Sequence, residues 1–142
     1  MTLSQLAFRS KASWGYSESF MRACRDELTV TEAQLRDGDR HCFIADSNGL
    51  AVGFYALVRS SADRYELDML FVAPEIMRAG IGKVLVEHAK QHAKALGARC
   101  MVIQGDPNAT AFYGAAGAVL VGERESASIP GRYLPEFAID LG

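Results

Sequence analysis

The sequence has few of the residues that mark disulfide-rich proteins or zinc sites. Only three of its 142 residues are cysteine, four are proline and one is tryptophan. The cysteines (Cys24, Cys42 and Cys100) are widely separated, and no two have the Cys-x-x-Cys spacing of a zinc site or a redox motif. An odd number of scattered cysteines predicts reduced thiols, which favours a cytoplasmic protein over a secreted one.

Long apolar runs and an excess of one charge are also missing. No run approaches the length of about 18 apolar residues that a membrane helix needs. Residues 1–9 lack the charged and apolar regions of a secretory signal. The 15 basic and 17 acidic residues give a net charge of −2, whereas binding to nucleic-acid phosphates needs a surplus of cations. We therefore expect neither a membrane nor a nucleic-acid partner.

The apolar residues, 49% of the chain, suffice for one domain with a substantial core. No repeat, low-complexity tract or linker interrupts the sequence, so we expect residues 1–142 to form a single domain. Helical spacing of apolar residues predicts three helices before Gly38 and a long amphipathic helix from Ile81 to Leu96.

The remaining periodicity predicts a β-meander followed by alternating strands and helices. The predicted strands are residues 41–46, 50–59, 64–72, 99–104, 118–123 and 137–141, and a short helix is predicted over residues 109–115. Three helices, a meander and then this alternation imply an α/β fold with a mixed sheet flanked by helices.

A glycine motif, Arg78-Ala79-Gly80-Ile81-Gly82-Lys83, lies between a predicted strand and the long helix. Glycines let a ligand approach the backbone closely, and the unpaired N–H groups of a helix start bind phosphate well. An ordinary turn with solvated charges explains the same residues. A P-loop is excluded because it needs glycine at Met77, and the dinucleotide motif is excluded because it needs glycine at Leu85.

Two further segments carry groups suited to proton transfer. By the two-residue period of a strand, one face of residues 64–72 carries Tyr65, Leu67, Met69 and Phe71, and the other carries Glu66, Asp68, Leu70 and Val72. A carboxylate on such a face takes a proton from a bound amine if it meets a cleft, or is merely solvated.

The segment from Asn108 to Gly117 has Asn108 and Tyr113 five residues apart across a helix start. The Tyr113 phenol is able to give a proton to a leaving thiolate, although Phe112-Tyr113 also suits core packing. His88 and His92 have the i, i+4 spacing of metal ligands, but no third ligand is evident, so we expect no metal site.

These motifs together, in this order and spacing between Phe43 and Glu123, resemble the GNAT N-acetyltransferase family. The resemblance implies a mainly antiparallel GNAT-type sheet and acetyl-CoA as cosubstrate. It implies that the loop from Arg78 to Lys83 (Arg78, Ala79, Gly80, Ile81, Gly82 and Lys83) holds the cofactor's pyrophosphate. It also implies that Leu70 and Val72 pair with the pantetheine arm through their main-chain groups.

The resemblance further implies that Asn108 contacts the cofactor and that Tyr113 is the general acid for the CoA thiolate. Glu66 falls where several family members carry a general base, with Asp68 or a water chain as alternatives. Met77 departs from the family's usual Gln or Arg. The first strand of the family is also missing, which leaves the edge of the Phe43 strand open to a partner chain such as a second copy in a homodimer.

The expected activity is direct transfer of an acetyl group to a primary amine. The alternatives are a non-catalytic acyl-CoA-binding or sensing module of the same fold, and an enzyme for another phosphate-bearing ligand. The acceptor is open among a small amine, an amino acid and a peptide N-terminus or lysine. We expect Trp14, Tyr16 and the loop 126–132 to shape its pocket.

Overall fold

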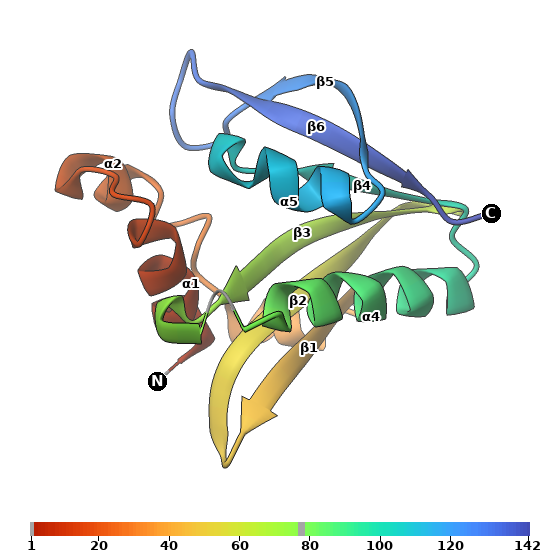
Figure 1. Cartoon of the computed structure of the whole chain (residues 1–142), viewed down its shortest axis with the longest axis horizontal. Coiled ribbons are helices and arrows are strands. Elements are labelled where there is room, and N and C mark those ends of the chain that lie inside the picture. Colours follow the sequence, from red (N-terminus) through yellow and green to blue (C-terminus); the bar gives the residue numbers. More distant parts are fainter. Residues whose placement is uncertain (1, 77–78) are drawn as a thin grey trace.

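Helices form the first third of the chain in the computed structural model, which describes residues 2–76 and 79–142 (Figure 1). They are α1 (Leu3–Ala12), α2 (Glu18–Ala23) and α3 (Glu32–Arg36). Each begins at a hydroxyl cap, because the side chains of Thr2, Ser17 and Thr31 accept the N–H of a residue in the first turn. Residues 2–39 contain no strand.

The sheet has six strands in the order β1-β2-β3-β4-β6-β5. Only β3 and β4 are parallel, and the other neighbours are antiparallel. The predicted mixed, mainly antiparallel sheet is therefore confirmed. The strands are β1 (Arg40–Ser47), β2 (Leu50–Ser61), β3 (Arg64–Val72), β4 (Cys100–Gln104), β5 (Val119–Glu125) and β6 (Tyr133–Asp140).

Helices cover both faces of this sheet and create two separate cores. On one face, α4 (Ile81–Ala95) and α5 (Thr110–Ala115) pack on residues such as Leu67, Met101 and Phe137. On the other face, α1 and the segment after α2 pack on Phe54 and Met69. Short 3₁₀ turns, η1 (Pro74–Ile76) and η2 (Pro107–Ala109), follow β3 and β4. None of the described helices is both long and apolar enough to cross a lipid bilayer.

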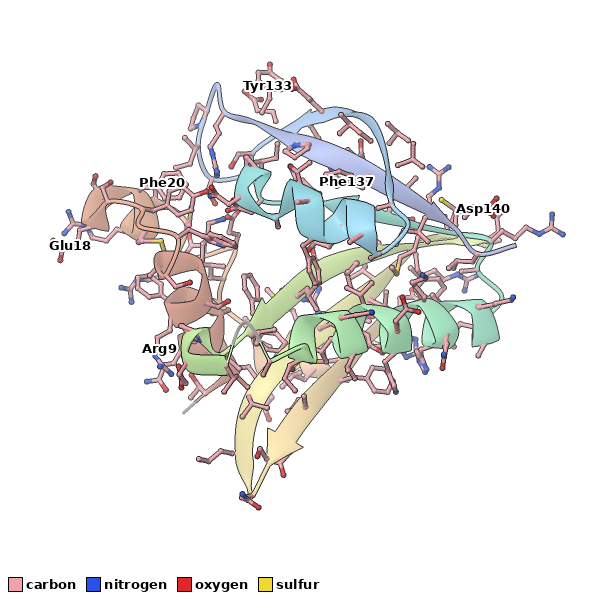
Figure 2. The ribbon with its side chains drawn as sticks, viewed as in Figure 1. Arg9, Glu18, Phe20, Tyr133, Phe137 and Asp140 are labelled. Carbon is pink, nitrogen blue, oxygen red and sulfur yellow. The ribbon has the colours of Figure 1, made fainter. Side chains whose placement is uncertain are left out.

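The elements follow the predicted order, and the largest difference is at the last strand. β6 begins at Tyr133 rather than at Phe137, and it includes Pro135. Pro135 is tolerated because it lies one residue beyond the last β4–β6 pair, Gln104–Glu136, where only its carbonyl bonds, accepting from the N–H of Gly105 at 3.0 Å. Phe137 points toward α5, and Tyr133 projects into solvent (Figure 2).

Candidate active site

A cleft opens in the middle of the sheet, between β3 and β4. These strands pair only over Arg64–Leu67 and Cys100–Ile103, and β3 then continues to Val72 with no strand beside it on that side among the described residues. The two halves of the sheet diverge toward α1 (Figure 1). The cleft has a volume of about 860 Å³ and is lined by α1, β3, the start of α4, the end of β4 and α5.

The side chains of β3 change faces at Asp68, where the cleft begins. Met69 pairs with Ala56 and Leu67 pairs with Leu57, so Asp68 has no partner on β2 and forms a β-bulge. Leu67 packs in the core beside α4, whereas Met69 packs in the core beside α1. The predicted continuous alternation along this strand is therefore wrong, because the inserted residue shifts the two-residue period by one.

The open edge of β3 presents main-chain groups to the cleft. The N–H of Ala73 donates to the carbonyl of Val52 on β2 at 2.8 Å. Since N–H groups alternate in direction along a strand, those of Leu70 and Val72 point away from β2. The N–H of Val72 lies 3.4 Å from the hydroxyl of Ser10, a buried residue of α1. Leu70 thus offers the N–H group closer to the bulge, whereas the N–H group of Val72 already contacts Ser10 of α1.

The glycine motif ends where α4 begins, beside the same cleft. Gly80 is the N-cap of α4 and has a φ of 86°, a left-handed conformation that favours glycine. The first i to i−4 bond of α4 runs from Val84 to Gly80, so the N–H groups of Ile81, Gly82 and Lys83 have no partner within the helix.

Two other residues of the predicted loop differ in what they offer. The N–H of Ala79 already donates to the carbonyl of Ile76 at 3.0 Å, so this amide is engaged within the chain. Arg78, predicted to bind the same phosphates, lies outside the described residues. The main-chain donors available to an anion are therefore those of the first turn of α4, and Lys83 is exposed beside them.

Tyr113 lines the cleft from α5 and is 7% exposed. Its ring packs against Phe112 and Phe137, with centroid distances of 5.2 and 5.5 Å. Gly105 makes room for it, because a Cβ there would lie 3.0 Å from the Tyr113 ring. Burial, and to a smaller extent the charge of Asp106, raises the pKa of the Tyr113 phenol above its ordinary value. The hydroxyl therefore stays protonated at neutral pH.

A hydrogen-bonded cluster centred on Tyr16 holds Asp106 and Asn108, two residues that line one wall of the cleft. The Tyr16 hydroxyl donates to the carboxylate of Asp106 at 2.9 Å and accepts from Asn108 Nδ2 at 2.9 Å and Arg132 Nη2 at 3.0 Å. One donated and two accepted bonds use the full capacity of a hydroxyl. The cluster therefore ties together the turn after α1, the loop after β4 and the loop between β5 and β6.

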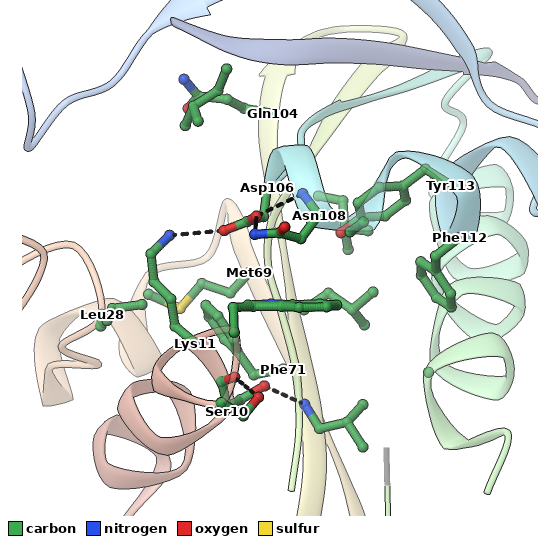
Figure 3. Close-up of a pocket in the computed structure, with 18 of the residues that line it drawn as sticks. Ser10, Lys11, Leu28, Met69, Phe71, Gln104, Asp106, Asn108, Phe112 and Tyr113 are labelled. Carbon is green, nitrogen blue, oxygen red and sulfur yellow. Dashed lines mark hydrogen bonds and ion pairs between the residues drawn. The ribbon is translucent and has the colours of Figure 1, made fainter. Parts of the chain in front are cut away.

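Lys11 adds a buried cation to this wall. Its Nζ lies 3.5 Å from Asp106 and 4.0 Å from Glu27, and its side chain is 10% exposed. Lys11 reaches across the cleft from α1 toward Asp106 (Figure 3). A buried lysine requires such anionic partners, because an unpaired charge away from water is costly. Asp106 and Glu27 supply these anionic partners.

One known protein family has a sequence pattern that matches most of this chain. The sequence pattern described as the acetyltransferase (GNAT) family matches residues 6–118. The chain belongs to the GNAT acetyltransferase family. No curated protein matches the sequence closely enough to supply a relative. The expected family is thereby confirmed, and membership supports acyl transfer in general.

Solved GNAT structures share the fold at low sequence identity. A GCN5-related N-acetyltransferase structure from Rhodopseudomonas palustris is 22% identical with a TM-score of 0.75, covering 97% of this chain and 87% of that one. The PaiA N-acetyltransferase of Thermoplasma acidophilum, in complex with coenzyme A, is 19% identical with a TM-score of 0.73, at 97% and 90% coverage. An aminoglycoside 6′-N-acetyltransferase complexed with coenzyme A is 18% identical, with a TM-score of 0.73 and coverage of 98% and 88%.

The structure separates two residues that the GNAT resemblance brought together. Tyr113 lines the cleft, but Glu66 does not. Glu66 lies before the bulge, where β3 still pairs with β4, and its Oε1 accepts from Arg124 Nη2 at 2.7 Å. Arg124 also lies 3.7 Å from Glu136. The role of Glu66 as general base stays a prediction, and its carboxylate is engaged in an ion pair.

The histidines lie on the opposite face from α1. His88 Nδ1 lies 2.6 Å from the Tyr55 hydroxyl, and the His92 ring packs against Phe43 at a centroid distance of 4.4 Å. No group of three or more side chains able to hold a metal ion occurs in residues 2–76 and 79–142. These rings therefore pack between α4 and the sheet.

The cluster of Tyr16, Lys11 and Asp106 was missed in the sequence because its members are far apart along the chain. Tyr16 was expected near a pocket, and Asp106 carried a signal of its own, since it follows a buried strand and precedes Pro107. Ligands of open sheets bind beyond the carboxyl ends of such strands. Of the segments expected to shape the acceptor pocket, Trp14 and Ala127 line the cleft, whereas Tyr16 does not and contacts it through Asp106 and Asn108. Their role toward the acceptor stays a prediction.

Proposed function

We propose that the chain transfers the acetyl group of acetyl-CoA directly to a primary amine. The observation that carries this proposal is a single cleft that joins three groups. These are the amides at the start of α4, which have no partner within the helix, the open edge of β3 and the buried side chain of Tyr113. Holding both substrates in one cleft removes much of the entropic cost of a bimolecular reaction.

The donor end of the cleft suits a diphosphate followed by an amide-bearing arm. The N–H groups of Ile81, Gly82 and Lys83 bind the phosphates, and the helix dipole favours the negative charge. Leu70 and Val72 pair with the arm through main-chain groups, as an added strand would pair with a sheet edge. Pairing at the N–H of Val72 replaces its contact with Ser10, whereas the N–H of Leu70 points into the cleft.

The reaction needs a polarised carbonyl, a free amine and an acid for the leaving group. The N–H of Leu70 donates to the thioester oxygen and stabilises the negative charge that develops there. Tyr113 gives its proton to the departing thiolate. Burial keeps its phenol protonated at neutral pH and at the same time makes it a weaker acid, so the transfer depends on the close placement of the thiolate. Glu66, Asp68 and a chain of water molecules are the candidates for the base that frees the amine.

A thiol-release assay with acetyl-CoA tests the function. The amine panel contains an alkylamine, amino acids, and peptides with a free N-terminus or a lysine. We expect amine-dependent release of CoA, and we expect Tyr113→Phe to lower kcat by about 10²–10⁴-fold. Phe112→Leu is the matched control, because it alters the neighbouring ring and leaves the hydroxyl in place. Stabilisation by CoA together with no transfer to any amine would favour the acyl-CoA-sensing alternative.

The cellular setting belongs to the same proposal. The three cysteines are free, which fits a cytoplasmic protein in a reducing compartment. The outer edge of β1 is an edge of the sheet, and a second copy of the chain in a homodimer would cover it. Light scattering of the purified protein measures the mass directly, and a monomer at all concentrations would refute the homodimer.

A further inference from the structure

We propose that Asp68, rather than Glu66, binds the ammonium group of the acceptor and accepts its proton. This inference rests on the proposed acetyl transfer. A primary amine is mostly protonated at neutral pH, so transfer to it requires a carboxylate, or water held by one, beside the thioester. Its position beside the open edge of β3, together with a free carboxylate oxygen, makes Asp68 the carboxylate of the cleft best placed for this role.

Asp68 is the residue at which β3 leaves β4. It follows Leu67, the last residue of β3 that pairs with β4, and it is the bulged residue opposite β2. Leu70, whose N–H points into the cleft, follows two residues later. Successive residues of a strand advance by about 3.3 Å, so Asp68 and Leu70 are separated by about twice that distance. An amine bound by the Asp68 side chain would therefore lie near a thioester bound at Leu70.

The carboxylate of Asp68 has one oxygen available. Arg40 Nη1 donates to Oδ2 at 2.9 Å, and no described residue is hydrogen-bonded to Oδ1. The Asp68 side chain is 39% exposed, and the residue lines the cleft. The free oxygen is thus open both to an acceptor and to water, which a proton must reach in the end.

The other carboxylates of the cleft are less suitable. Asp106 accepts from Tyr16 and from the main-chain and side-chain N–H groups of Asn108, and it also pairs with Lys11. Glu27 lies 4.0 Å from Lys11. Glu75, in η1 after the end of β3, accepts a hydrogen bond from Arg9 at 2.9 Å. Glu66 lies outside the cleft lining.

Arg40 is a positioning residue for this carboxylate. Its side chain is 8% exposed, and its guanidinium also contacts the sulfur of Met69 at 3.5 Å. These contacts hold the guanidinium beside the bulge. Among the described residues, the other charged ones lining the cleft are Lys11, Glu27, Glu75 and Asp106, and Lys11 is held by Asp106 and Glu27. Arg40 therefore holds Oδ2 of Asp68 in place and leaves Oδ1 directed to other partners.

The protons balance over one turnover. Asp68 takes one proton from the ammonium group, an N–H bond breaks and an O–H bond forms, and the proton passes to solvent. The amine nitrogen then attacks the thioester carbon, the C–S bond breaks, and the thiolate takes the proton of Tyr113. The second proton of the nitrogen returns through water to the Tyr113 oxygen. The products are the amide, CoA thiol and one released proton.

The test compares Asp68→Asn with Glu66→Gln, which removes the charge of the neighbouring carboxylate on the same strand. The assay uses the amine of the panel that gives the highest wild-type rate. We expect Asp68→Asn to lower kcat/KM for that amine by about 100-fold or more at pH 7. The loss should shrink as pH rises toward the pKa of the amine. Glu66→Gln tests the rival base on the same strand and should lower kcat/KM far less than Asp68→Asn does.

Two further measurements keep the proposal refutable. Both variants should retain the wild-type thermal stabilisation by CoA, which shows that the fold and the donor site are intact. If Asp68→Asn fails to fold, Asp68→Ala is assayed with added formate, which should restore part of the lost rate. The proposal is overturned if Asp68→Asn keeps the wild-type rate and pH profile, or if Glu66→Gln shows the loss instead. A wild type that transfers to no amine overturns the proposed function itself.

Discussion

The left-handed conformation of Gly80 allows the proposed phosphate site at the start of α4 to be tested by a substitution that adds a single carbon atom. Gly80 has a φ of 86°, and a Cβ added there would meet nothing within 4 Å. The cost of Gly80→Ala is therefore conformational rather than steric, and it amounts to about 1–2 kcal/mol for an L-residue in this region. The backbone relieves this strain by rotating, which turns the following N–H groups away from their present direction.

Gly97, at the other end of α4, supplies the matched control. It has a φ of 96°, and a Cβ there also meets nothing within 4 Å. Gly97→Ala should thus cost the same 1–2 kcal/mol. For a chain of 142 residues, each kcal/mol corresponds to a fall of about 3–5 °C in Tm. We expect similar losses of Tm in the two variants.

Coenzyme A binding should separate the two variants. Isothermal titration should give a Kd at least tenfold weaker for Gly80→Ala, which is about 1.4 kcal/mol, and an unchanged Kd for Gly97→Ala. The reasoning about the amides of α4 is refuted if both variants bind CoA as wild type does. It is equally refuted if both lose affinity to the same extent, since the effect would then follow stability alone.

Two further predictions concern the wall of the cleft and the histidines. Tyr16→Phe leaves the partners of a half-buried hydroxyl unsatisfied and should cost about 1–3 kcal/mol. Its KM for the amine should rise with an unchanged KM for acetyl-CoA, and equal changes in both would argue against an acceptor-side role. Burial, with the neighbouring His41 and His88, lowers the pKa of His92. The unfolded chain then binds a proton more readily, so the free energy of unfolding should fall as pH drops below about 6.5. His92→Phe should flatten this dependence in denaturant titrations.

The order of the elements was predictable because local patterns set it. Hydroxyl caps before α2 and α3, and the Asn48-Gly49 turn with positive φ at both residues, were all visible in the sequence. The glycine motif was likewise expected at the start of a helix, because the apolar residues that follow it recur with helical spacing. In each case, the physical cause lies within a few residues of its effect.

The contacts around Tyr16 were not predictable in the same way, although Tyr16 and the loop 126–132 were expected to shape a pocket. Lys11 pairs with Asp106, and Arg132 donates to Tyr16, although these residues come from distant segments. No local pattern announces such a contact, because each residue alone is an ordinary polar side chain at the end of an element. Only the sheet topology, which brings the loop after β4 opposite α1, places them together.

The bulge at Asp68 is the most informative departure from the sequence pattern, because it divides β3 between two tasks. Up to Leu67 the strand pairs with β4, and the side chain of Leu67 enters the core beside α4. After Asp68 the strand has a free edge, and Met69 turns toward α1. With strict alternation, Met69 would have faced α4, and Leu70 would have faced α1. One extra residue therefore places Met69 in the core beside α1 and packs Leu70 against the core beside α4, with an open main-chain edge after Leu67.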